Sequence, residues 1–349
     1  MPKSSRKTRS VVTINDVAAL AGVSPMTVSR VVNAEKNVRP AKREAVLAAV
    51  RQLNYAPNLA ARSLAKAEET KIGVIYNNPS AAYLSEFLVG MLDETAGKGA
   101  QLVLVKCEAV DEPAERKAVA LLLAASVTGV VLPPPLSESD VVRDILKAAG
   151  VATVAVATGK ARGDLSCVRV DDNRAAFEMT QRLLELGHRR IGFITGHPNQ
   201  TASAERLQGF RQAMAGAPDA QSQVVQGYFS FASGLTAAEE LLDGPLPLTA
   251  IFASNDDMAA AAVSVAHRRG LDVPRDLTVV GFDDTAVATT LWPPLTTVRQ
   301  PVSAMAAAAI DLLLTEIRAR KDGAPPRPVD RVTPHTLIER QSSGPAPRA

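Results

Sequence analysis

The chain has 349 residues, of which 46% are hydrophobic and 21% charged, a composition typical of globular proteins with two or three domains. Its net charge of +3 is unevenly distributed, because residues 1–66 hold 12 Lys/Arg against three Asp/Glu and the remainder has an acidic excess. Solvated surface charge alone does not explain this segregation, which predicts an anionic partner for the basic end. Two cysteines and four scattered histidines exclude a disulfide framework or a zinc site, so we expect no metal and no cofactor.

The N-terminus shows no targeting signal. Its first ten residues, MPKSSRKTRS, are basic and are predicted to form a disordered arm, but no apolar stretch follows them. No apolar run reaches membrane-spanning length. We therefore expect a cytoplasmic protein with no membrane partner.

Residues 12–33 are predicted to form two short helices joined by a tight turn. Thr13 and Asp16 have the spacing of a capping box, and Gly22 stands where the first helix ends. Ser24 caps the second helix, and Pro25 occupies its first position. The apolar residues of both helices recur at helical spacing, and the second helix keeps a polar, basic outer face. This pattern is typical of a helix-turn-helix, although an αα-hairpin without nucleic acid has the same geometry.

A third helix is predicted from Pro40, with a stripe of Val46, Ala49, Val50 and Leu53 that closes a small core. That core is expected to include Leu20. After a breaker at 54–58, residues 59–65 form a run of helix formers that is marginal alone in water and needs a partner.

From residue 71 onward, strands and helices alternate. Strands are predicted at 72–76, 101–106, 128–132, 152–157, 190–195, 224–227, 250–253, 278–282 and 333–338. Helices are predicted at 83–98, 114–124, 140–149, 173–186, 202–215, 233–242, 257–269 and 302–320. Short apolar strands between amphipathic helices indicate parallel sheets covered on both faces. We interpret them as two doubly wound lobes with a ligand crevice between them.

Several of these strands end in polar residues that would face the crevice. Examples are Asn77-Asn78, the loop at 196–200, Ser254-Asn255-Asp256-Asp257 and Asp283-Asp284. Amides, carboxylates and the Arg206 guanidinium suit a ligand with many hydroxyl groups. For any one residue, capping of the next helix is an equally good explanation. No phosphate-binding or nucleophile motif accompanies them, so we expect no enzyme and no catalytic residue.

Several motifs resemble those of the lactose-repressor (LacI/GalR) family. At the N-terminus they are TIxDVAxxAGVSxxTVSRVxN from Thr13 and LxYxPNxxARxL from Leu53. In the body they are LGHRRIG from Leu186, ERxxGF from Glu205, NDxMA from Asn255, VGFDD from Val280 and PLTTVxQ from Pro294. The resemblance runs from about residue 12 to residue 338.

The resemblance implies a helix-turn-helix DNA-binding domain followed by a two-lobed α/β, periplasmic-binding-protein-like (type I) domain. We expect a basic arm at 1–10, the DNA-binding domain at 11–57, a hinge helix and linker at 58–70 and a flexible tail at 341–349. The ligand-binding and dimerisation domain would span 71–340. Its first lobe would comprise about 71–169 and 302–330, and its second about 170–298 and 331–340.

The resemblance also implies the residues that bind DNA. Pro25, Met26 and Arg30 would face the bases, and Leu64 would be an apolar wedge in the minor groove. Ser24, Thr27, Ser29 and Asn33 would mostly hold phosphates, with a further phosphate contact from Arg39. The other residues expected to bind DNA are Thr13, Tyr55, Asn58 and Arg62.

The same resemblance implies an allosteric, homodimeric, nucleoid-associated regulator on a palindromic operator. It implies a repressor of carbohydrate uptake or catabolism genes that a small, sugar-like effector releases. A nucleobase or another non-sugar corepressor is the alternative. The ligand residues carried over are Tyr83, Asp172, Arg206, Asn255, Asp256, Asp283 and Gln300. Trp292 is interpreted as a cleft wall, or equally as a core or interface residue.

Overall fold

The computed structural model describes residues 12–32, 38–55, 70–323, 325 and 327–347. It divides into two compact units, Met1–Glu69 and Thr70–Ala349. The predicted basic arm and hinge helix lie outside the described residues, as do Asn33, Asn58, Arg62 and Leu64.

In its described residues, the first unit has three short helices, α1 (Ile14–Ala21), α2 (Pro25–Val32) and α3 (Pro40–Gln52). The predicted capping box is confirmed, because the Asp16 carboxylate accepts hydrogen bonds from the Thr13 backbone N–H and hydroxyl, both at 2.7 Å. Gly22 ends α1 with φ at +64°, a conformation that costs glycine little.

The core of this unit is apolar and small. It is formed by Val17, Ala18, Val28, Val31, Val46 and Ala49. The prediction that Leu20 belongs to this core is wrong, because its side chain is 46% exposed. With about 100° per residue, Leu20 lies roughly 60° round the helix from Val17, on the side away from Ala18.

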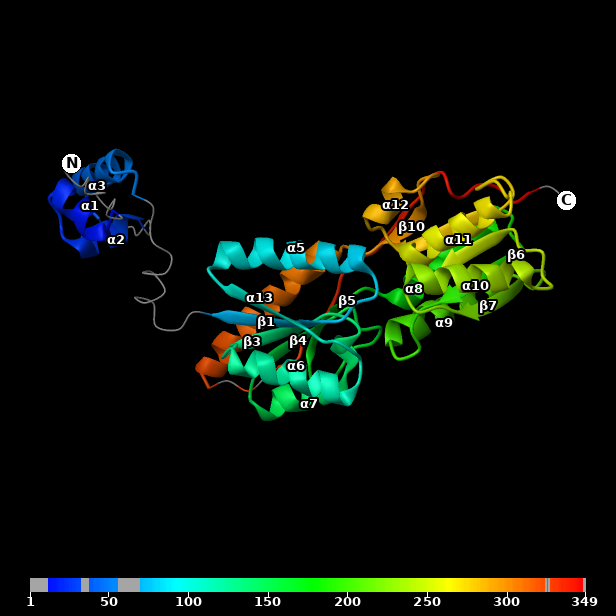
Figure 1. Ribbon diagram of the computed structural model, residues 1–349, viewed down its shortest axis with the longest axis horizontal. Helices are drawn as coiled ribbons and strands as arrows, with labels where there is room; N and C mark the ends of the chain where they lie inside the picture. The colour runs from blue at the N-terminus through cyan, green and yellow to red at the C-terminus, as the bar shows by residue number, and fades with distance from the viewer. Residues whose placement is uncertain (1–11, 33–37, 56–69, 324, 326, 348–349) are drawn as a thin grey trace, which may run out of the picture. The chain divides into compact units, whose positions relative to one another are not determined.

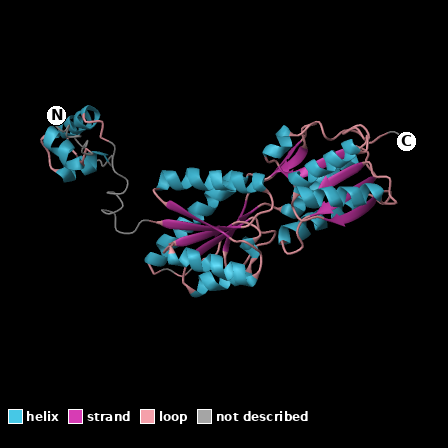
Figure 2. Ribbon diagram, in the orientation of Figure 1, coloured by secondary structure: helices cyan, strands magenta, loops and turns pink. Residues whose placement is uncertain are grey.

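The second unit contains two six-stranded sheets, each with helices on both faces (Figures 1 and 2). The first sheet is parallel, and its strands run in the order β11-β5-β4-β3-β1-β2. Its strands are β1 (Lys71–Tyr76), β2 (Gln101–Lys106), β3 (Gly129–Leu132), β4 (Ala152–Val156), β5 (Ser166–Arg169) and β11 (Asp330–Val332).

The second sheet has the order β12-β10-β9-β8-β6-β7, and only β12 is antiparallel to its neighbour among these strands. Its strands are β6 (Arg190–Thr195), β7 (Gln221–Gln226), β8 (Ala250–Ala253), β9 (Thr278–Asp283), β10 (Thr296–Arg299) and β12 (Thr336–Ile338). Two lobes with doubly wound, mostly parallel sheets are therefore confirmed.

The helices of each lobe form two layers (Figure 1). In lobe 1, α5 (Ala81–Lys98) and α13 (Val302–Lys321) cover one face, whereas α6 (Glu112–Ala124) and α7 (Asp140–Ala148) cover the other. In lobe 2, α8 (Asp172–Glu185) packs with α9 (Thr201–Ala215), and α10 (Phe231–Asp243) packs with α11 (Asp256–Arg268). A short 3-10 helix, η1 (Leu136–Glu138), and α12 (Ala286–Thr290) complete the lobes. Among the described residues, no helix is long and apolar enough to span a membrane.

The chain passes between the lobes three times. It crosses from β5 to α8, from β10 to α13 and from β11 to β12. The strand predicted at 333–338 is shorter than expected: residues 336–338 form β12, residues 333–335 belong to the crossing segment, and β11 precedes them. At the crossing, the Thr333 backbone N–H and hydroxyl both donate to the Arg169 carbonyl, at 2.7 and 2.8 Å.

The flexible tail predicted at 341–349 is also at odds with the structure, which describes residues 341–347 as packed against lobe 2. Ser342 is buried, and its hydroxyl donates to the Val279 carbonyl at 2.6 Å and accepts from the Thr296 N–H at 2.8 Å. The Ala346 N–H donates to the Leu186 carbonyl at 2.9 Å. These contacts join residues far apart in sequence, which local patterns do not reveal.

Candidate functional site

The outer face of α2 is polar and exposed, and it is held in place by its buried inner face. Val28 and Val31 are buried in the core, which turns Pro25, Met26 and Arg30 outward. The Met26 side chain is 65% exposed and lies on the same face.

Ser24 caps α2 as predicted, because its hydroxyl accepts from the Thr27 N–H at 3.3 Å and contacts the Thr27 hydroxyl at 3.0 Å. Thr13 and Arg39 are exposed beside the helices. Thr27, Ser29 and Tyr55 are half-buried, and Tyr55 packs against the three-helix core. Tyr55 is therefore a packing residue whose remaining surface is open. A short helix with this polar and cationic face has the chemistry to contact phosphates and base edges.

A small cavity of about 40 Å³, which we call the inner cavity, lies between the lobes. Its walls come from residues that follow the carboxyl ends of strands in both lobes, as the sequence predicts. Lobe 1 contributes Asn78, Pro79, Ser80, Tyr83, Pro134 and Ala157. Lobe 2 and its crossing contribute Gln200, Ala202, Arg206, Phe229, Asn255, Asp283 and Gln300.

Arg206, on α9, is the best-fixed side chain in this wall and is only 5% exposed. Its Nε donates to Asp172 Oδ1 at 2.7 Å, and another guanidinium nitrogen donates to the Ser254 carbonyl. Its guanidinium carbon lies 3.6 Å from the centroid of the Phe282 ring. Stacking and ion pairing together fix the planar fork of donors in one orientation.

Asp283 completes a polar cluster with Arg206 and Gln300. The Gln300 Nε2 donates to Asp283 Oδ1 at 2.6 Å, and the Arg206 guanidinium lies 3.8 Å from the same oxygen. Burial raises the pKa of Asp283 well above its ordinary value, although Arg206 acts in the opposite direction. Burial likewise raises the pKa of Asp172, again opposed by Arg206. The Asp283 carboxyl group and the Arg206 guanidinium thus offer an acceptor and donors for ligand hydroxyl groups in this wall.

Two buried polar atoms of the inner cavity have no hydrogen-bond partner among the described residues. They are the Tyr83 hydroxyl and the Gln300 Oε1. Burial raises the pKa of the Tyr83 phenol, so its hydroxyl stays protonated and acts as a donor. Each such atom costs about 1–3 kcal/mol while it has no partner. A ligand hydroxyl between them would satisfy both.

Not every predicted ligand residue faces the inner cavity. The Asp256 carboxylate is buried at the start of α11, where it accepts from the Thr297 hydroxyl at 2.6 Å and the Thr285 N–H at 2.8 Å. It fixes the β10 and α12 segments to α11, so its predicted ligand contact is not supported by its position. Asp172 also lies outside the cavity wall and positions Arg206 instead.

Asn255 lies in the wall, but its amide is used within the protein. Its Oδ1 accepts from the Met258 N–H and its Nδ2 donates to the Phe229 carbonyl, both at 3.0 Å. Trp292 is 75% exposed, which rules out the core role considered for it.

One set of hydrogen bonds between the lobes, which we call the Glu138–Thr201 clasp, was not predicted from the sequence. The Glu138 carboxylate of lobe 1 accepts from the Thr201 N–H at 2.9 Å and from its hydroxyl at 2.8 Å, at the first turn of α9. The Gly159 N–H donates to the same hydroxyl at 2.9 Å. An anion at a helix N-terminus is a favourable arrangement, yet no sequence motif marks Glu138. Phe229 was also missed, although it follows the carboxyl end of β7 and a search of every strand end would have included it.

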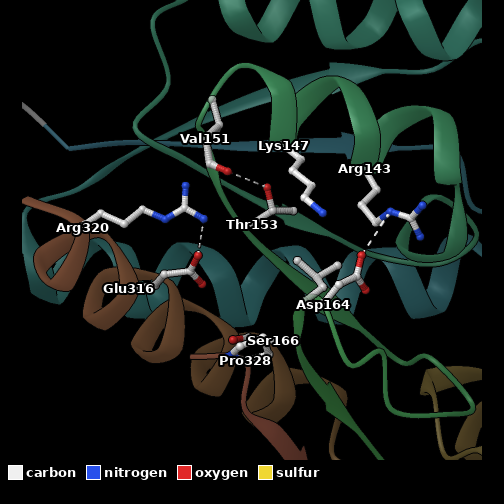
Figure 3. Close-up of a pocket in the computed structure, with 10 residues that line it drawn as sticks. Arg143, Lys147, Val151, Thr153, Asp164, Ser166, Glu316, Arg320 and Pro328 are labelled. Carbon is white, nitrogen blue, oxygen red and sulfur yellow. Dashed lines mark hydrogen bonds and ion pairs between the residues drawn. The ribbon is translucent and has the colours of Figure 1, made fainter. Parts of the chain in front are cut away.

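A separate cavity of about 320 Å³ in lobe 1 is not a convincing ligand site (Figure 3). It lies where β4 and β5 begin, at the edge of the sheet away from the inner cavity. Arg320 donates there to the Gly150 carbonyl at 2.7 Å and pairs with Glu316, and Lys147 lies in the last turn of α7. Cations at the ends of α7 and α13 compensate carbonyl groups and helix dipoles, which accounts for their presence.

Comparisons with known proteins agree with this two-part architecture. Residues 13–58 match the family described as bacterial regulatory proteins, lacI family, and residues 180–343 match the periplasmic binding protein-like domain. The HTH-type transcriptional regulator CelR of Thermobifida fusca is 37% identical over 339 residues, which cover 95% of this chain and 98% of CelR.

Two solved structures have the same fold over nearly the whole chain. A complex of the transcriptional regulator CelR with cellobiose has a TM-score of 0.71 at 34% identity and covers 95% of this chain and 99% of its own. The lac repressor dimer bound to operator and the anti-inducer ONPF has a TM-score of 0.73 at 29% identity, with the same coverage.

Proposed function

The chain belongs to the LacI family of bacterial regulatory proteins, and from that premise we propose how it recognises DNA and what releases it. It binds a palindromic operator as a homodimer through α2 and represses transcription of carbohydrate uptake or catabolism genes. A sugar-like molecule in the inner cavity releases it. Such a protein works in the cytoplasm on the nucleoid and needs no catalytic step.

The observation that carries the effector proposal is the pair of unpartnered polar atoms beside a fixed Arg206 and Asp283. Tyr83 supplies a donor, Gln300 an acceptor and Arg206 a planar fork, all in one cavity. Neighbouring hydroxyl groups of a sugar match this mixture of donors and acceptors, and the Phe229 ring offers an apolar wall. A nucleobase corepressor is the alternative, and it is distinguished by direct binding.

The DNA proposal rests on the exposed face of α2. Pro25, Met26 and Arg30 would contact base edges, with Arg30 suited to guanine and Met26 to a thymine methyl group. Ser24, Thr27 and Ser29 would hold phosphates. Leu64 is proposed as the minor-groove wedge, from a segment outside the described residues.

The homodimer proposal is supported by exposed apolar side chains near the free edge of each sheet. In lobe 1 they are Val89 and Leu92 on α5 and Leu104 on the edge strand β2. In lobe 2, Val224 lies on the edge strand β7 and Phe231 begins α10. Exposed apolar groups at sheet edges are typical of association surfaces, and a dimer formed through them would cover edges that otherwise promote aggregation.

The proposed switch is a change in how the lobes meet. A buried water takes roughly 10–15 Å³ of such space, so the inner cavity holds about three waters and a sugar ring requires the lobes to move apart. The Glu138–Thr201 clasp opposes this movement. Coupling of roughly 1–3 kcal/mol between the two arrangements would change operator affinity about five- to 150-fold.

The test is operator binding by the full-length protein. DNA fragments are selected from a random library, and their gel shifts are then measured with and without a panel of neutral sugars and nucleobases. We expect palindromic fragments and release by a sugar. Release or tightening by a nucleobase alone would overturn the sugar proposal.

A matched pair of variants tests the site itself. Arg206→Lys keeps a charge beside Asp172 but loses the planar fork, so it should stay on the operator when the sugar is added. Arg211→Ala removes an exposed arginine from the same helix and should be released normally. Equal release of both variants would contradict the assignment of Arg206.

A further inference from the structure

A second and larger cavity, the outer cavity, adjoins the inner one between the lobes. Its volume is about 470 Å³, against about 40 Å³ for the inner cavity. Pro79 and Gln200 line both, so these two side chains form the partition between them. The remaining walls follow the carboxyl ends of strands in both lobes, including Asn77 after β1 and His197 after β6.

Two consecutive aromatic residues line different cavities. Phe229 lines the inner cavity and Tyr228 lines the outer one. Phe229 has φ at +60°, a left-handed backbone conformation that a side chain rarely adopts without tertiary support. Gly196 leaves room for the ring in this conformation, because a Cβ there would lie 1.9 Å from the Phe229 ring. The backbone is thus held in a conformation that presents one ring to each cavity.

Tyr228 forms an open platform in the outer cavity. It is 47% exposed, and the His197 ring meets it edge-on at a centroid distance of 5.6 Å. The Tyr228 N–H donates to the Ser233 hydroxyl at 3.0 Å, which anchors its backbone to α10. Asn77, Asn199 and Gln200 place amide groups around the platform. An aromatic face surrounded by amides suits the apolar face and hydroxyl rim of a sugar ring.

The charge of the outer cavity restricts its ligand. Four carboxyl groups line it, from Asp111, Glu112, Glu115 and Glu138, and none of the described lining residues is Lys or Arg. Glu115 Oε2 accepts from the Ser139 hydroxyl at 2.7 Å, which fixes one of these groups in the wall. Such a wall repels phosphorylated and acidic sugars.

From this arrangement we propose that the effector is a neutral oligosaccharide of at least two rings. Its terminal ring occupies the inner cavity when the lobes move apart, and its next ring stacks on Tyr228 in the outer cavity. The chain of sugar units passes the partition formed by Pro79 and Gln200. This inference rests on the proposed function, because it extends the same effector site.

Calorimetry on the full-length protein tests it with three neutral series: glucose, cellobiose and cellotriose; glucose, maltose and maltotriose; and xylose, xylobiose and xylotriose. Cellobionate serves as the acidic probe. In the series that binds, we expect the disaccharide to bind at least tenfold more tightly than the monosaccharide. We expect cellobionate to bind more weakly than cellobiose.

Variants then locate the second ring. Tyr228→Ala should weaken disaccharide binding roughly three- to tenfold and change monosaccharide binding less than twofold. Tyr228→Phe keeps the ring and should restore disaccharide affinity. Leu121→Ala removes an exposed apolar side chain on α6 that lines neither cavity and should have no effect.

The outcomes separate this inference from the proposed function. Equal affinity for mono- and disaccharides, or no effect of Tyr228→Ala on disaccharide affinity, overturns the two-ring proposal. In either case, sugar binding that still depends on Arg206 upholds the proposed function. If no sugar in any series binds, both are overturned.

Discussion

Replacement of Tyr83 by Phe removes one oxygen atom and should act in opposite directions on stability and on effector binding. The Tyr83 side chain is buried, and its hydroxyl has no hydrogen-bond partner among the described residues. Without ligand, loss of this unsatisfied group should stabilise the protein by up to about 1–3 kcal/mol. With the effector bound, the same change removes a hydrogen bond of about 0.5–1.5 kcal/mol, so affinity should fall at least roughly two- to 13-fold, and further by the stability that the free protein gains.

The assay is urea unfolding of the full-length protein, followed at the transition of the ligand-binding unit, together with calorimetric titration of the binding sugar. Tyr76→Phe is the matched control, because Tyr76 is a half-buried tyrosine at the end of β1 that does not line the inner cavity. It should leave effector affinity unchanged. A Tyr83→Phe protein that is destabilised without ligand and binds the sugar normally would refute the reasoning.

The remaining predictions concern pH, salt and the DNA-binding unit. Burial raises the pKa of Asp256 to about 7, so between pH 4 and 7 the folded state binds more protons at this group than the unfolded state. Its contribution to the free energy of unfolding therefore falls as pH rises, by at most about 1.4 kcal/mol per pH unit. Asp256→Asn should remove this part of the pH dependence when the free energy of unfolding is measured between pH 4 and 7. An unchanged pH dependence would show that Asp256 is ionised in the folded protein. Because residues 1–66 carry the basic excess, operator affinity should fall roughly 10³–10⁵-fold between 50 and 200 mM salt, and a flat dependence would contradict phosphate binding. Deletion of residues 1–66 should abolish the gel shift and leave sugar affinity unchanged by calorimetry, whereas residual sequence-specific DNA binding would place recognition elsewhere.

Elements fixed by local chemistry were predicted well from the sequence. Thr13, Asp16 and Gly22 set the ends of α1 through contacts within one turn, and Ser24 does the same for α2. The six-residue parallel strands with apolar runs, such as β2 and β6, were also placed correctly. The polar residues after β1, β6, β8 and β9 do meet at one cavity, because parallel strands direct their carboxyl ends to the same edge.

Features that depend on distant contacts were not predictable in the same way. The strands β5, β10 and β11 are only three or four residues long, too short for a periodic signal, and they exist because a neighbouring strand pairs with them. Asp256 and Asp283 both lie at the carboxyl ends of apolar strands, and only the contacts with Thr285 and Thr297 show that the Asp256 carboxylate is used within the protein and does not line the inner cavity. A strand-end pattern reveals which residues gather, not which way each side chain points.

Reciprocal binding affinities of the full-length wild-type protein test the central claim most directly. Operator affinity is measured with and without saturating sugar, and sugar affinity with and without operator. If the inner cavity controls DNA binding, each ligand should weaken the other by the same factor, about five- to 150-fold. Sugar that binds with equal affinity to free and operator-bound protein would contradict the account.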